Sequence, residues 1–190
     1  MPAPCRTPNL RRRLALALAL AGLLAACSPV QDWRDVRFDL SELKAQLPCK
    51  PDHTVREVPM GSRTVRLEVL GCESGEVMLT LMNTRLEAGQ DVNAILQGWQ
   101  TASLARVKAQ APSPEPWHRP GMLPLPGAQR ITVRGQQANG QPLGYDAVWG
   151  AWMQDGQIQL VHAALYDSRP EARHPAAAQL APTFFESIRP

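Results

Sequence analysis

The sequence of 190 residues is poor in the short motifs that carry enzyme chemistry. It has no H-E-x-x-H or C-x-x-C pattern, no G-x-S-x-G nucleophile turn and no glycine-rich phosphate loop. Its four histidines show no spacing typical of a zinc site. It also has no stripe of basic and aromatic residues typical of nucleic-acid binding. We therefore expect a protein that is not an enzyme, with no metal, no cofactor and no nucleic-acid partner.

The sequence has a single long apolar run, Leu14–Leu24, preceded by four arginines. About eleven residues are too few to span a bilayer core of roughly 30 Å, but they suit the apolar region of a signal peptide. The run ends in Leu24-Ala25-Ala26-Cys27, which resembles the bacterial lipobox. The alternative is an ordinary signal peptide in which Cys27 plays no part.

The lipobox resemblance implies cleavage before Cys27 and a lipid anchor on that cysteine. It divides the chain into a lipoprotein signal peptide (1–26), a lipidated tether (27–32) and one domain (33–190). Fewer than ten tether residues reach at most about 30 Å, so the domain should lie close to its membrane. We expect it in the cell envelope, facing the periplasm. Ser28 stands where an aspartate tends to retain lipoproteins in the inner membrane, which favours the outer one.

The formal net charge of +3 would belong to the precursor alone. Residues 1–26 hold four of the 20 basic residues and none of the 17 acidic ones. The mature chain would then carry 16 basic and 17 acidic residues, a net charge of −1. The positive charge therefore does not indicate a nucleic-acid partner.

The remaining cysteines fit an exported protein. Cys5 lies in the signal segment and Cys27 would take the lipid, which leaves the pair Cys49 and Cys72. These two flank a predicted strand hairpin that could bring their Cα atoms within bridging range, in a compartment where disulfides persist. We predict a disulfide between them; a buried free pair and a redox couple are the alternatives.

Periodicity predicts a chain of mixed strands and helices. Strands are expected over 33–39, 56–60, 64–71 and 77–82; in the third, Val65, Leu67 and Val69 share a face opposite Arg66 and Glu68. The segment 38–48 is ambiguous, because Leu40, Leu43 and Leu47 fit helical spacing. A helix capped by Asp91 is expected over 91–110, and the six prolines of 111–127 predict a semi-rigid surface loop.

Three further strands, 130–136, 143–153 and 158–166, are joined by turns at Asn139-Gly140 and Asp155-Gly156, which predicts an antiparallel meander. A helix over 176–187, with a break at Pro182, ends the chain. The fold class is therefore α+β, an antiparallel sheet with helices packed on it.

Two segments resemble a known family. The tail Phe184-Phe185-Glu186-Ser187-Ile188-Arg189 and the segment Leu47-Pro48-Cys49-Lys50-Pro51 are similar, with the order of elements, to the Mog1/PsbP-like α/β/α sandwich. The whole chain also resembles small proteobacterial lipoproteins. The resemblance implies a role in binding partners within larger complexes, and it assigns no binding residue.

The proline-rich loop carries the candidate partner contact, Trp117, His118, Arg119 and Met122, because aromatic and arginine side chains are favoured at interfaces. The alternative is an ordinary connection with Trp117 folded onto the core. His162 is expected to be a hydrogen-bonded sheet histidine, and Met78 and Met82 to fill the core rather than bind copper.

The sequence thus predicts a membrane-anchored accessory or binding lipoprotein with an unknown protein partner. The alternative is a lipoprotein that binds a small ligand or metal in a pocket between sheet and helix.

Overall fold

A computed structural model describes residues 31–87, 89–171 and 176–190. The predicted signal peptide and Cys27 therefore lie outside the described residues. Residues 31–190 form one compact unit that contains the whole described core and the disulfide. We therefore expect this unit to fold without residues 1–30.

The unit is built on a seven-stranded antiparallel sheet in the order β3-β4-β5-β9-β8-β7-β6. Its strands are joined mostly by tight hairpins, which turn at Gly61-Ser62 and at the predicted positions Asn139-Gly140 and Asp155-Gly156. The strand bounds are β3 (Asp52–Met60), β4 (Arg63–Ser74), β5 (Val77–Leu86), β6 (Gln110–Pro116), β7 (Gln129–Gln136), β8 (Pro142–Gln154) and β9 (Gln157–Asp167).

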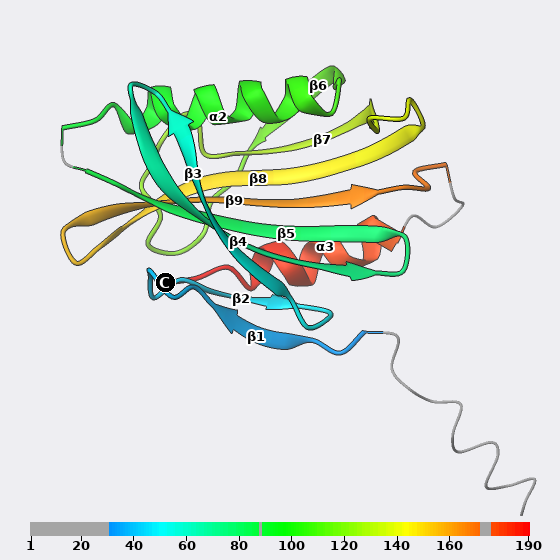
Figure 1. Cartoon of the computed structure of the whole chain (residues 1–190), viewed down its shortest axis with the longest axis horizontal. Coiled ribbons are helices and arrows are strands. Elements are labelled where there is room, and N and C mark those ends of the chain that lie inside the picture. Colours follow the sequence, from blue (N-terminus) through cyan, green and yellow to red (C-terminus); the bar gives the residue numbers. More distant parts are fainter. Residues whose placement is uncertain (1–30, 88, 172–175) are drawn as a thin grey trace, which may run out of the picture. The chain divides into compact units, whose positions relative to one another are not determined.

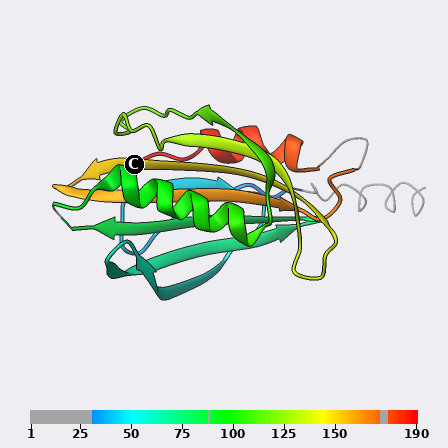
Figure 2. The same cartoon turned by 90° about the horizontal axis from the view of Figure 1, so that it is seen from above.

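Two helices and a small hairpin cover the sheet (Figures 1 and 2). The helix α2 (Val92–Arg106) lies on one face, and α3 (Ala176–Glu186) lies on the other with the hairpin of β1 (Arg34–Arg37) and β2 (Lys44–Leu47). As predicted, the Asp91 side chain caps α2 by accepting a hydrogen bond of 3.0 Å from the Ala94 N–H. The α+β class, an antiparallel sheet with helices packed on it, is confirmed.

The core has two halves, one on each face of the sheet. The side chains of β8 alternate between the two halves: Tyr145, Ala147 and Trp149 pack on the α2 side, whereas Val148 and Trp152 pack on the α3 side. Trp149 and Trp152 are both fully buried, so neither is exposed as a ligand platform.

The helical alternative for 38–48 is wrong. Residues 44–47 form β2, which pairs with β1 in register from Arg34↔Leu47 to Arg37↔Lys44. Leu43, Ala45 and Leu47 are all buried, so the strand alternates with a period of two that the small Ala45 concealed. The prediction of a strand over 33–39 is confirmed by β1.

The prediction of a loop over 111–127 is wrong at its amino-terminal end. Residues 110–116 form the edge strand β6, and α2 stops at Arg106 rather than at Gln110. Pro114 and Pro116 are spaced by two in the regularly paired part of β6, so their nitrogens face the same side of the strand, whereas Pro112 lies in the irregularity between Gln110 and Ser113. That side is the open edge of the sheet, where a missing N–H costs no ladder hydrogen bond.

The carboxy-terminal tail is part of the α3 layer. Phe184 and Phe185 of α3 are buried, and Pro182 is accommodated within the helix. After the helix, Arg189 pairs with Lys44 of β2 through two backbone hydrogen bonds of 2.8 and 3.0 Å. The tail therefore extends the β1–β2 hairpin by a third short segment.

Candidate functional site

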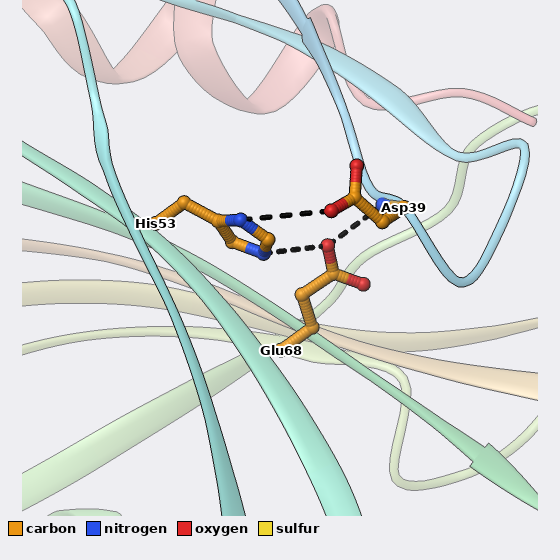
Figure 3. Close-up of side chains that lie close together, drawn as sticks. All are labelled: Asp39, His53 and Glu68. Carbon is orange, nitrogen blue, oxygen red and sulfur yellow. Dashed lines mark hydrogen bonds and ion pairs between the residues drawn. The ribbon is translucent and has the colours of Figure 1, made fainter.

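Three side chains from separate elements meet beneath the β1–β2 hairpin: Asp39 in its loop, His53 in β3 and Glu68 in β4 (Figure 3). Within the part of the chain that the structure describes, they are the one group of three His, Cys, Asp or Glu residues close enough to hold a metal ion. We call them the Asp39–His53–Glu68 cluster.

Glu68 is the centre of the cluster, and its side chain is fully buried. Its Oε1 accepts the Asp39 N–H at 2.7 Å, and its Oε2 accepts the Leu40 N–H at 3.1 Å. The same Oε1 lies 2.8 Å from the Nε2 of His53. A buried carboxylate is tolerated only with such partners, so Glu68 fastens the hairpin loop to the sheet.

The other side of the His53 ring faces Asp39 across a wider gap. Its Nδ1 is 3.7 Å from the Asp39 Oδ2, which is too long for a hydrogen bond. The side chains of Asp39 and His53 are 77% and 37% exposed, so this gap opens to solvent. The sequence offered no spacing signal for the cluster, because its members come from three elements.

A second candidate lies between α2 and the strands β3, β4, β5 and β9. It is a groove of about 590 Å³, which we call the α2 groove, and ligand pockets commonly have such volumes. Its apolar lining includes Met60, Leu67, Val69, Met78, Met82 and Trp99. Thr80, Ser103 and Tyr166 add hydroxyl groups, and Arg56 and Arg106 add positive charge.

The two arginines of the α2 groove have no carboxylate partner within the described part of the chain. Among the described residues, neither Arg56 nor Arg106 takes part in an ion pair. Both residues are exposed, so their guanidinium groups are free to meet a ligand. An unpaired pair of cations beside apolar surface favours a ligand that combines an anionic group with an apolar body.

The methionines predicted to fill the core line this groove instead of being fully buried. Met82 lies directly opposite His162 across the β5–β9 pair, and Met78 lies opposite Tyr166. Met78 and Met82 are four residues apart on one strand, which separates their Cα atoms by roughly 13 Å. That separation does not suit joint ligation of one copper ion, so we treat the methionines as the apolar lining of the α2 groove.

His162 is one of the residues that line the α2 groove, and it is buried. Its Nε2 lies 3.0 Å from the Tyr145 hydroxyl, and its ring stacks on Trp149 with a centroid distance of 4.5 Å. The prediction of a hydrogen-bonded sheet histidine is met at this nitrogen, but within the described residues Nδ1 has no partner. Burial lowers the pKa of His162 to about 3, so the ring is neutral near pH 7.

The lowered pKa of His162 makes stability depend on pH. Between pH of about 6.5 and about 3, the His162 ring is protonated in the unfolded chain and neutral in the folded chain. The free energy of unfolding should therefore fall as pH decreases, by up to about 1.4 kcal/mol per pH unit from this group. Urea unfolding from pH 7 to pH 4.5 should show a shallower slope for His162→Gln than for wild type. Equal slopes would contradict the assignment.

The predicted disulfide is confirmed. Cys49, just before β3, is bonded to Cys72 in β4, with their Cα atoms 5.9 Å apart. The bridge lies at the end of the β3–β4 hairpin, as the flanking positions predicted. In the chain-entropy model a loop of this length stabilises the fold by about 3 kcal/mol.

The four residues of the predicted partner contact differ in burial and in what they contact. Trp117 is only 9% exposed, and it packs edge-on against Trp152 at a centroid distance of 6.0 Å. Met122 packs against the same half of the core, whereas His118 is exposed and Arg119 is half-buried. Arg119 donates a hydrogen bond to the Glu186 carbonyl at the end of α3. A contact with a partner through this segment stays a prediction.

None of the described helices is long and apolar enough to cross a membrane. The chain matches no family model, and no curated protein sequence matches it. The fold and the two candidate sites are therefore the basis for proposals about function.

Proposed function

We propose that the chain is a lipoprotein of the bacterial envelope that binds a ligand and catalyses no reaction. The lipobox-like segment ending at Cys27 supports export and anchoring to a membrane, on its periplasmic side and preferentially the outer one. The Cys49–Cys72 disulfide agrees with a periplasmic location, because disulfides persist in oxidising compartments.

The α2 groove is the single observation that carries the binding role. In the described structure it combines an apolar lining, buried His162 with no partner at Nδ1, and two arginines without carboxylate partners. This combination favours the small-ligand alternative over a protein partner. The ligand that fits is a small amphiphile with an anionic head for Arg56 and Arg106 and an apolar chain for the methionine floor.

Octanoate is a suitable probe for the binding role, with octanol as a ligand of equal chain length and no charge. The unit 31–190 should bind octanoate in calorimetry, and the double change Arg56→Ala, Arg106→Ala should weaken binding at least tenfold. A charge-assisted hydrogen bond contributes about 1.5–3 kcal/mol, and 1.4 kcal/mol corresponds to a factor of ten.

Arg37→Ala is the matched control, because Arg37 is an exposed arginine of β1, away from the groove lining. It should leave the affinity for octanoate unchanged. Two results would overturn the proposal: octanol binding as tightly as octanoate, or the double variant binding as wild type does.

We further propose that the fold belongs to the Mog1/PsbP-like α/β/α sandwiches. The arrangement of α2 and α3 on opposite faces of one antiparallel sheet supports this likeness. Members of that group mostly act by binding partners, which agrees with a role without catalysis. A protein partner at His118 and Arg119 remains compatible with a ligand in the groove, because the two places lie on different parts of the surface.

A further inference from the structure

We propose that the Asp39–His53–Glu68 cluster binds a divalent transition-metal ion such as Zn²⁺ between His53 Nδ1 and Asp39 Oδ2. This proposal is independent of the α2 groove, whose lining includes none of the three residues. It rests on the width of the gap, the orientation of the imidazole ring and the exposure of the Asp39 and His53 side chains.

The width of the gap suits a bridging ion better than a hydrogen bond. Zinc binds histidine nitrogen and carboxylate oxygen at about 2.0–2.2 Å, so tetrahedral coordination places the two ligand atoms about 3.4 Å apart. The observed distance from Nδ1 to Oδ2 is 3.7 Å. An adjustment of about 0.3 Å, well within the freedom of the exposed Asp39 side chain, would complete the geometry.

Glu68 orients the His53 imidazole so that its Nδ1 can bind a metal ion. Its oxygens already accept two backbone N–H groups, so the carboxylate acts as an acceptor and receives the Nε2–H of His53. In the neutral ring, the proton on Nε2 leaves the lone pair on Nδ1, directed toward Asp39. A carboxylate that orients the histidine through its second nitrogen is the usual support of a protein-bound zinc ion.

The surroundings of the gap determine the kind of ion and its affinity. A nitrogen and a carboxylate oxygen favour zinc and its neighbours over Mg²⁺ and Ca²⁺, which prefer oxygen ligands alone. Among the described residues two protein ligands, His53 and Asp39, would bind the ion, and water would supply the other ligands from the solvent side. Binding should therefore be micromolar rather than nanomolar. The ion would also tie the hairpin loop to β3, through Asp39 and His53.

The test is zinc titration of the unit 31–190, whose two cysteines are both in the disulfide and offer no thiol. Calorimetry should show saturable binding of one Zn²⁺, and Mg²⁺ at the same concentration should not bind. Asp39→Asn and His53→Gln should each weaken zinc binding at least tenfold. Both positions are exposed, so these variants should keep the fold, which circular dichroism without zinc can check.

Two matched controls separate this site from general surface binding. Glu42→Gln removes another exposed carboxylate from the same hairpin loop, and His118→Gln removes another exposed histidine. Neither should change the affinity. Nitrogen-15 NMR of the histidine rings should show zinc on Nδ1 of His53 and a proton on Nε2. Absence of saturable binding, equal affinity in the Asp39 and His53 variants, or zinc on Nε2 would overturn the proposal.

Discussion

Replacing Trp117 by alanine should lower the free energy of unfolding by about 3–5 kcal/mol. The indole is 9% exposed and fills the space above Gly150, where an added Cβ would lie 2.9 Å from its ring. It also packs edge-on against Trp152. Removing it would leave a cavity in the α3 half of the core, because these rigid neighbours cannot close the space. Urea unfolding monitored by circular dichroism measures the loss.

His118→Ala is the matched control for the Trp117 change. His118 is the next residue and is exposed, so its removal should change stability by no more than about 0.5 kcal/mol. A Trp117→Ala protein as stable as wild type would contradict the packing described here. The alternative role of Trp117 would then be the predicted contact with a partner.

Replacing Cys27 by alanine should abolish lipid labelling and release the protein from membranes. The thioether to the lipid needs the sulfur of this residue, and alanine has none. Growth with a labelled fatty acid, followed by membrane fractionation, measures both effects. Cys5→Ala is the matched control, because Cys5 lies within the predicted signal peptide and should be removed with it. Unchanged labelling and fractionation of Cys27→Ala would contradict the anchor.

Local patterns were sufficient to predict most of the sheet and both helices. The turns at Asn139-Gly140 and Asp155-Gly156 predicted the meander β7–β8–β9, and Asp91 predicted the beginning of α2. The disulfide followed from the positions of Cys49 and Cys72 around a hairpin. In each case the signal lies within a short stretch of chain.

The edge strand β6 shows where composition misled the prediction. Prolines usually exclude a strand, but Pro112, Pro114 and Pro116 recur every second residue. In the regularly paired part of β6, that spacing turns the missing N–H groups of Pro114 and Pro116 to the outer edge, while Ser113 and Glu115 keep theirs toward β7. The spacing of the prolines indicates an edge strand, whereas their number had suggested a loop.

The candidate sites depend on contacts that no local pattern contains. Alternation predicted Glu68 only on the strand face opposite the apolar residues, and it did not predict that the β1–β2 hairpin covers this side chain and supplies two of its hydrogen bonds. The α2 groove likewise exists because α2 leaves part of the sheet near β3 and β4 uncovered. Burial of a charged side chain and the depth of a groove both follow from packing between distant segments.

The intact mass of the protein extracted from its own membranes tests the central claim, a lipid-anchored binding protein of the envelope, most directly. The account predicts a chain that begins at Cys27, carries acyl chains on that residue and lacks the thiol hydrogens of Cys49 and Cys72. A chain that retains residues 1–26, or that begins elsewhere without lipid, would contradict it.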